Sequence, residues 1–223
     1  MNKGIRLVNM AFLVLSVVGA ACYDRWGGLG LKALNAAVFT VLGMINGVYV
    51  MCKKCGRPLE MMLALAFCMA ADIVLWHSFV AGAMLFAVGH LFYFAGFCRM
   101  EKLRRSDLAP GAALFVPVLA MLLFWRRLRF GGTVMQGVCI GYALIISLMF
   151  GKALSNLIRK KCRAYALIVL GSALFVVSDI MLLLNVFARA PHITDTLCLF
   201  TYFPGQCILA HAIYHLTAVK EDV

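Results

Sequence analysis

Residues 163–188 of the chain are RAYALIVLGSALFVVSDIMLLLNVFA. After the basic residue at its start, this stretch holds one charged residue, Asp179, with apolar sequence on both sides. A helix that spans the hydrocarbon core of a bilayer needs about 20 consecutive, mostly apolar residues. The stretch therefore predicts a transmembrane helix that carries a carboxyl group inside the membrane.

Similar apolar stretches occur along the whole chain. Together with the first one, the predicted spans are roughly residues 5–23, 29–51, 59–76, 79–98, 109–125, 133–157, 163–188 and 195–217. Of the 223 residues, 64% are hydrophobic and 13% are charged, more apolar than a soluble domain. No segment between the spans is long enough to fold alone. We therefore expect one all-α integral membrane domain over residues 1–223, a polytopic bundle of about eight transmembrane helices.

Two of these stretches have features of their own. The first follows Lys3 and Arg6, as the apolar part of a secretory signal does. Ala20-Ala21-Cys22 is a poor cleavage site, so we expect this stretch to be retained as the first helix. The third stretch is among the shortest, and it turns into the fourth at Trp76-His77-Ser78, which predicts a tight helical hairpin.

The basic residues predict how the bundle is oriented. The formal net charge is +12, which in a soluble protein suggests nucleic-acid binding, but in a membrane protein basic residues gather in cytoplasmic loops. If the N-terminus is cytoplasmic, that side holds Lys3, Arg6, Lys53, Lys54, Arg57, Arg99, Lys102, Arg104, Arg105, Arg159, Lys160, Lys161, Arg163 and Lys220. The other side holds Arg25, Arg126, Arg127, Arg129 and Arg189. The asymmetry predicts that both termini are cytoplasmic, and the arginines between 126 and 129 are its exception.

Asp72 and Asp179 lie in the interior of predicted spans with apolar sequence on both sides, whereas the other seven acidic residues lie in loops, at helix ends or at the C-terminus. An ionisable side chain at such depth costs roughly 2.5–3.5 kcal/mol and marks a functional site by default. The alternative is a structural pair with a basic side chain or a backbone group. Both helices run in the same direction in the predicted topology, so the two carboxyl groups lie at similar depth and can face one cavity. Burial and mutual repulsion disfavour two negative charges there, so one carboxyl can stay protonated and act as a general acid.

Other polar side chains are paired along the predicted helices. Three pairs have the spacing of one helix face, and they are Lys32 and Asn35, His90 and Tyr93, and Tyr202 and Gln206. Each pair alone is equally well explained by a hydrogen bond between helices. Their occurrence at a depth similar to that of the aspartates favours a shared site.

Two further features have the spacing of metal ligands. His211 and His215 are four residues apart, which suits zinc, but they lie toward the predicted cytoplasmic end and are better explained as core or interfacial histidines. Cys52 and Cys55 form half of a zinc knuckle, and the chain has no second C-x-x-C to complete it. We therefore expect neither a metal nor an organic cofactor.

Five short stretches carry a resemblance to a known family. They are Leu31–Leu34, Ala71–Leu75, Phe86–Tyr93, Gly171–Asp179 and Thr201–Gln206. In this order and with this spacing they resemble the YhhN-type lysoplasmalogenase family of membrane proteins. Both aspartates match that family, whereas Ala71 stands where it usually has glycine and Phe203 where it often has a second tyrosine.

The resemblance implies an eight-helix membrane enzyme that cleaves the vinyl ether bond of lysoplasmalogens into a fatty aldehyde and glycerophosphocholine or glycerophosphoethanolamine. One of Asp72 and Asp179 would be the acid, while the other would stabilise the cation and guide water; the sequence leaves open which is which. The residues expected to bind substrate are Lys32 (on the phosphate), Asn35, His90, Tyr93, Ser178, Tyr202 and Gln206. The expected partners are a lysophospholipid substrate and membrane lipids, with no nucleic acid, and the oligomeric state stays open. The expected location is an integral membrane protein, in the plasma (inner) membrane if the source is bacterial.

Three other functions remain open on the sequence. A proton-coupled transporter also uses intramembrane aspartate and histidine, and the weak similarity of Asp72–Leu75 to Asp179–Leu182 is the only hint of the repeats such folds contain. A zinc-dependent membrane lipid hydrolase would use His211, His215 and an aspartate. A non-catalytic lipid-binding or assembly protein would tolerate the loss of both aspartates.

Overall fold

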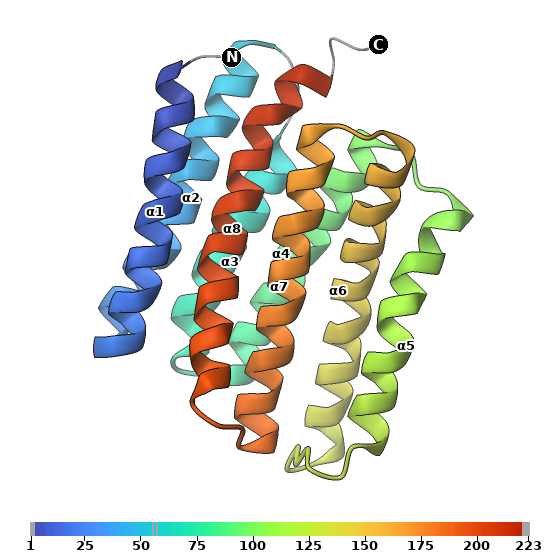
Figure 1. The fold of residues 1–223 in the computed structure, drawn as a ribbon. Helices are drawn as coiled ribbons and strands as arrows, with labels where there is room; N and C mark the ends of the chain where they lie inside the picture. Colours follow the sequence, from blue (N-terminus) through green and yellow to red (C-terminus); the bar gives the residue numbers. More distant parts are fainter. Residues whose placement is uncertain (1–2, 55, 57, 220–223) are drawn as a thin grey trace.

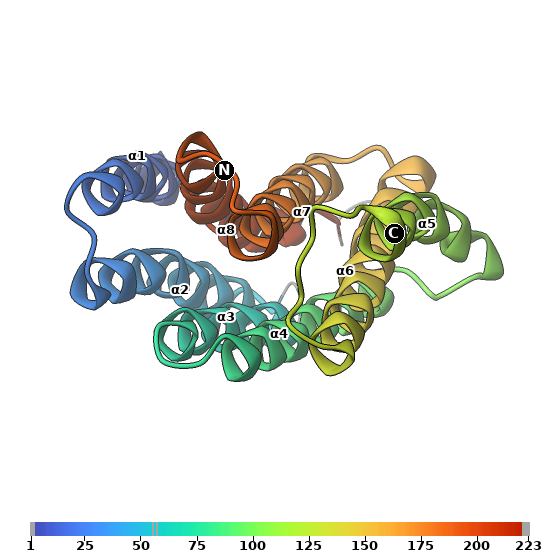
Figure 2. The same cartoon turned by 90° about the horizontal axis from the view of Figure 1, so that it is seen from below.

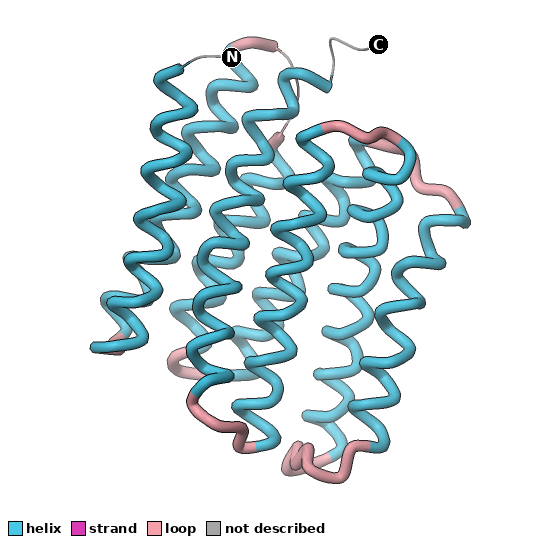
Figure 3. Tube along the Cα trace, in the orientation of Figure 1, coloured by secondary structure: helices cyan, strands magenta, loops and turns pink. Residues whose placement is uncertain are grey.

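The computed structural model describes residues 3–54, 56 and 58–219. In this part of the chain there are eight α-helices and one short 3-10 helix, joined by short connections and without strands (Figures 1 and 3). They are α1 (Lys3–Trp26), α2 (Leu29–Cys52), α3 (Leu59–Leu75), α4 (Phe79–Met100), η1 (Arg105–Asp107), α5 (Leu108–Phe124), α6 (Thr133–Arg159), α7 (Arg163–Ala188) and α8 (Ile193–Val219). The prediction of an all-α polytopic membrane bundle is confirmed.

Seven helical segments of the described chain are long and apolar enough to cross a membrane, if η1 and α5 are taken together. The eighth, α3, has 17 residues, which at 1.5 Å per residue is about 25 Å. Figure 1 shows α3 running beside the longer helices through the bundle. The short third span expected from the sequence is therefore a shorter helix of the same bundle.

Local sequence determines where these helices begin and end. The predicted hairpin between α3 and α4 occurs at Trp76–Ser78, where the Ser78 hydroxyl accepts a hydrogen bond from the Ala81 amide and caps α4. At the end of α7, Arg189 adopts a left-handed conformation with φ of 50°, and its amide donates to the Leu184 carbonyl. Both turns lie at the end of the bundle opposite to the start of α1, which we call the opposite end (Figure 1).

The helices form two facing layers when the bundle is viewed along its axis (Figure 2). One layer contains α1, α8 and α7, and the other contains α2, α3 and α4, with α6 bridging α4 and α7. Among the described elements, α5 packs only against α6 and η1, so it lies at the edge of the bundle. The backbones of α3 and α4 do not approach that of α7, and the space between the layers there is occupied by side chains and by the cavities described below.

Glycines allow two pairs of helices to approach closely. A Cβ atom on Gly151 of α6 would lie 2.4 Å from the amide nitrogen of Gly111 in α5. A Cβ atom on Gly171 of α7 would lie 2.9 Å from the carbonyl oxygen of Gly205 in α8. Small residues at such crossings let helix backbones pack tightly in lipid, where apolar side chains gain little by leaving the hydrocarbon.

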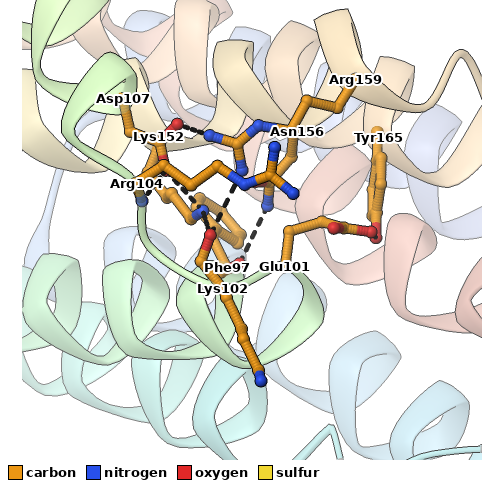
Figure 4. Close-up of polar contacts among 9 residues, drawn as sticks. All are labelled: Phe97, Glu101, Lys102, Arg104, Asp107, Lys152, Asn156, Arg159 and Tyr165. Atoms are coloured by element: carbon orange, nitrogen blue, oxygen red, sulfur yellow. Dashed lines mark hydrogen bonds and ion pairs between the residues drawn. The ribbon is translucent and has the colours of Figure 1, made fainter.

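A polar network holds the connection between α4 and α5 against α6 at the end where α1 begins, which we call the terminal end (Figure 4). Asp107 of η1 is 4% exposed and pairs with Lys152 at 2.8 Å and with Arg159. The Lys152 ammonium also donates to the Lys102 carbonyl at 3.2 Å, and Asn156 donates to the Phe97 carbonyl at 2.9 Å. These bonds satisfy a lysine that is 1% exposed, and they fix one end of the peripheral helix α5.

Candidate functional site

The two intramembrane aspartates line the same cavity. Asp72 of α3 and Asp179 of α7 both border a space of about 330 Å³ between the two layers. Lys32, Ser178 and Tyr202, three of the other predicted site residues, also line it. The cavity extends toward the opposite end of the bundle, where its wall is formed by residues next to the α1–α2 and α7–α8 connections, namely Tyr23, Asp24, Gly27, His192 and Asp195.

Asp72 is held by a cation and by a hydroxyl group. The Tyr202 hydroxyl donates to one carboxylate oxygen at 2.6 Å, and the Lys32 ammonium lies 3.7 Å from the other. The residue is 2% exposed. A buried carboxylate is stable only when its charge is paired and its oxygens accept hydrogen bonds, and Asp72 meets both conditions in its ionised form.

Asp179 has a different environment. The Tyr142 hydroxyl donates to its Oδ2 atom at 2.7 Å, and the His90 Nε2 atom lies 3.9 Å from the same oxygen. Among the described residues, no lysine or arginine pairs with Asp179. Two carboxyl groups thus face one cavity, but only Asp72 has a lysine beside it.

The hydrogen bonding of His90 identifies its tautomer. Its Nδ1 atom lies 2.6 Å from the Phe86 carbonyl oxygen, and because a carbonyl can only accept, Nδ1 carries the proton. In the neutral ring Nε2 then has a free lone pair, and it is buried without a hydrogen-bond partner in the structure. In this neutral form the atom is an acceptor facing Asp179, which suits a protonated carboxyl group.

Aromatic rings fix the positions of these polar groups. The Tyr202 ring makes edge-to-face contacts with Phe39, Phe86 and Phe175, with centroids 6.0, 5.8 and 5.3 Å away. The His90 ring contacts Phe175 edge-to-face at 4.5 Å. Such packing leaves each ring few alternative rotamers, so the donors and acceptors around both aspartates are held in place before a ligand arrives.

The remaining predicted binding residues lie at different distances from the cavity. Ser178 lines it, with its hydroxyl 3.4 Å from the Cys198 thiol. Tyr93 and Gln206 are fully buried, are bonded to each other at 2.8 Å, and are not among the residues that line the cavity. They therefore form a layer behind it.

Asn35 has a structural contact instead of the expected place in the site. Its side-chain amide donates to the Gly19 carbonyl of α1 at 2.9 Å, and it is absent from the cavity wall. It shares a helix with Lys32, but its side chain is committed to packing α2 against α1. Of the expected pair of substrate-binding residues on α2, Lys32 lines the cavity and Asn35 does not, and substrate binding by either residue stays a prediction.

Tyr142 is the polar neighbour of the aspartates that the sequence did not indicate. It lies in the interior of α6, between a glycine and an alanine, and no strongly polar residue shares its helix face. The residues three and four positions away are Val138, Cys139, Ile145 and Ile146. Its partner is 37 residues along the chain. The only available signal was a hydroxyl group in the middle of a predicted span, which most often indicates an interhelical hydrogen bond.

The two features with metal-ligand spacing do not gather further ligands. The Nε2 atoms of His211 and His215 lie 3.1 Å apart, and the rings stack at 5.0 Å, among core side chains of α8. Within the described residues no three His, Cys, Asp or Glu side chains come together in a way that would hold a metal ion. Cys55, the second member of the Cys52 pair, lies outside the described residues.

Comparison with known proteins places this arrangement in a family. Searches of curated proteins and of solved structures find no match for the chain. A family model described as the YhhN family matches residues 29–213, a range that begins with α2 and ends within α8. The match covers both aspartates and each neighbour discussed above, from Lys32 to Tyr202, and most of the chain, so this membrane protein belongs to the YhhN family.

Proposed function

We propose that the protein hydrolyses the vinyl ether bond of a lysoplasmalogen, with Asp179 as the general acid and Asp72 as the carboxylate that stabilises the cation and guides water. The observation that carries this proposal is the unequal surroundings of two aspartates in one cavity. Lys32 balances the charge of Asp72 at 3.7 Å, whereas Asp179 has the Tyr142 hydroxyl and the His90 ring beside it and, among the described residues, no lysine or arginine. Membership of the YhhN family supports the same chemistry.

The division of roles follows from charge balance in a membrane interior. One lysine can compensate one carboxylate, and a second uncompensated negative charge beside it is strongly disfavoured at low dielectric. The site is therefore most stable with Asp72 ionised and Asp179 protonated. A general acid must hold its proton before the reaction, and a cation-stabilising group must be negative, so each aspartate has the charge that its role needs.

The reaction then proceeds in three steps, which are proton transfer to carbon, addition of water and cleavage of the carbon–oxygen bond. Asp179 gives its proton to the outer vinyl carbon, whose π electrons form the new C–H bond and leave an oxocarbenium ion. Water adds to the cationic carbon and loses a proton to a carboxylate, which gives a hemiacetal. The hemiacetal hydroxyl then gives its proton to a carboxylate while the glycerol oxygen takes a proton from a protonated carboxyl group, and the bond between that oxygen and the carbon breaks. One water is consumed, an aldehyde and an alcohol are formed, and Asp179 is protonated again. The logic parallels glycoside hydrolysis by paired carboxylates.

Lys32 has a second use in this scheme. It lines the cavity on the side toward the opposite end of the bundle, near the residues of the α1–α2 and α7–α8 connections. A lysophospholipid whose vinyl ether lies between the aspartates would direct its phosphate toward that end. The ammonium group can then contact the phosphate while it compensates Asp72.

The proposal is tested by measuring aldehyde release from a lysoplasmalogen by the purified protein in detergent. Wild-type protein should release aldehyde, and in heavy water the aldehyde should carry one deuterium on the carbon next to the carbonyl group. Asp179→Asn and Asp72→Asn should each lower turnover by about 10²–10⁴-fold, the usual contribution of such groups. Thermal unfolding and gel filtration serve as folding controls. Near-normal turnover in both well-folded variants, or aldehyde without deuterium, would contradict the mechanism.

A further inference from the structure

A second cavity of different character meets the first one at Asp179. It lies between α4, α5, α6 and α7, has a volume of about 80 Å³, and is lined almost entirely by apolar side chains. Leu75, Phe86, Asp179 and Leu182 line both cavities, so they form the boundary between them. Asp179 is therefore at the junction of a polar space and an apolar one.

The peripheral helix α5 forms the outer wall of this apolar cavity. Leu114, Val118 and Leu122 line it, and their spacing of four residues places them on one face of α5. Val116 lies on a different face and is 61% exposed. Since α5 packs directly only on α6 among the described helices, the space between α5 and α7 is filled by side chains and by the cavity, not by close backbone contact.

We propose that this apolar cavity holds the alkenyl chain of the substrate next to the reacting bond, with the headgroup in the polar cavity. This inference rests on the proposed function, which identifies the reacting bond as the vinyl ether. A lysoplasmalogen has one polar end and one apolar end, and its vinyl ether lies where they meet. The polar and the apolar cavity also adjoin each other, as the two ends of the lipid do, and the carboxyl group assigned as the acid lies at the boundary between the cavities.

The size of the apolar cavity limits how the chain is held. A space of about 80 Å³ encloses only the first part of a long chain, so the remainder must continue along α5 into the surrounding lipid. Hydrocarbon in lipid and hydrocarbon against leucine are equally apolar, so little affinity comes from this transfer. The wall acts instead by positioning, because it fixes the vinyl carbon against Asp179. One apolar cavity at the junction also suits a lipid with a single chain.

Two substitutions on α5 test the assignment with a matched control. Val118→Phe fills the cavity, whereas Val116→Phe adds the same group to the lipid-facing side of the same helix. The readout is the ratio of kcat/KM for a hexadecenyl lysoplasmalogen to that for a short-chain propenyl analogue. Val118→Phe should lower this ratio by about tenfold or more, in the range of steric discrimination in apolar pockets, and Val116→Phe should leave it unchanged. An unchanged ratio in Val118→Phe would overturn the proposal.

A binding measurement separates this inference from the reaction itself. The probe is a non-hydrolysable alkyl ether lysophosphocholine with a diazirine close to the ether oxygen, used on wild-type protein and on Val118→Phe. Labelling should fall on peptides of α5 and α6 that line the cavity, between 114 and 122 and between 138 and 147, and should decrease in Val118→Phe. If this pattern occurs in protein that releases no aldehyde, the chain site stands and the proposed reaction fails. If aldehyde is released but the label falls on helices that do not line the apolar cavity, the reaction stands and the chain site is wrong.

Discussion

At the scale of single residues, the chemistry proposed for Asp179 depends on the hydroxyl group of Tyr142. This hydroxyl donates to the carboxyl oxygen at 2.7 Å, and its bond strengthens when Asp179 loses its proton and becomes negative. Tyr142→Phe should therefore lower kcat for aldehyde release by about tenfold to a hundredfold, because a hydrogen bond to a charged group contributes about 1.5–3 kcal/mol. Tyr49→Phe, which changes a ring that contacts Tyr214 outside both cavities, should have wild-type kcat. Equal rates in the two variants would remove Tyr142 from the mechanism.

Glu101, in the connection after α4, should make stability depend on pH. The hydrogen bond from the Lys160 ammonium holds the pKa of this carboxyl below its usual 4.5. A group with a lowered folded-state pKa stabilises the protein above its unfolded pKa, and this contribution disappears as the pH falls through the folded pKa. Glu101→Gln should therefore lower the free energy of unfolding by up to about 1 kcal/mol at neutral pH. Denaturant titrations in detergent at a series of pH values should show this difference shrinking below about pH 4.5.

The residues of the site differ in how well the sequence indicates them. Asp72 and Asp179 can be found because an acidic residue inside an apolar span is costly, and the structure places both at one cavity. Tyr142 cannot be found this way, since a tyrosine in a span carries no such cost. Asn35 differs from Lys32, because spacing puts both on the same helix face while the Asn35 amide donates to the Gly19 carbonyl and does not line the cavity. Helix periodicity predicts the face on which a side chain lies but not the group with which it forms a hydrogen bond.

At the scale of helices, the close packing of α5 on α6 should depend on Gly151, which has no Cβ atom. A Cβ atom on Gly151 would lie 2.4 Å from the Gly111 amide nitrogen, so Gly151→Ala must push the helices apart. This overpacking should lower the free energy of unfolding by about 1–3 kcal/mol. Gly141→Ala on the same helix is the control, because its Cβ atom meets nothing within 4 Å and should stabilise α6 slightly. Thermal unfolding of both variants in detergent tests the pair, and a Gly151→Ala variant as stable as Gly141→Ala would contradict this crossing.

The buried ion pair behind the α4–α5 connection should show strong coupling. Asp107→Asn leaves the Lys152 ammonium, which is 1% exposed, without its carboxylate, and should cost about 3–5 kcal/mol. Adding Lys152→Met to Asp107→Asn should recover much of the lost stability, because the double variant has no unpaired buried lysine. Lys102→Met is the control, since only the backbone carbonyl of Lys102 takes part in the network (Figure 4). Additive effects of the two substitutions would show that the pair is not coupled.

Helix boundaries are the part of the fold that the sequence predicts best. The span predicted over 163–188 coincides with α7, and that over 133–157 ends two residues before α6 does at Arg159. A long apolar run bounded by charged residues must form a helix over almost its whole length in a bilayer, because every backbone polar group there must be hydrogen-bonded within the helix. Which helices pack against each other cannot be predicted from such short stretches of sequence. The peripheral place of α5 follows from contacts such as Gly111 against Gly151 and Asp107 against Lys152, which join positions about forty residues apart.

At the scale of the whole molecule, the direction in which the bundle crosses the membrane determines which leaflet supplies the substrate. The start of α1 and the end of the described part of α8 lie at the same end of the bundle, as an even number of crossings requires (Figure 1). The residues that line the outer part of the polar cavity, such as Asp24 and Asp195, lie at the opposite end. The excess of basic residues at the terminal end predicts that this end is cytoplasmic. The headgroup would then enter from the non-cytoplasmic side.

Cysteine labelling in intact cells tests that orientation. In a variant whose other cysteines are replaced, Cys52, which is exposed at the terminal end of α2, should react with a membrane-impermeant maleimide only after permeabilisation. Arg127→Cys, on the same background with Cys52 also replaced, lies at an exposed position between α5 and α6 at the opposite end and should react without permeabilisation. The reverse pattern would place the terminal end outside and make the arginines between 126 and 129 follow the general charge rule. The polar cavity would then open toward the cytoplasm, and lysophospholipid supplied from inside the cell would be the substrate to test first.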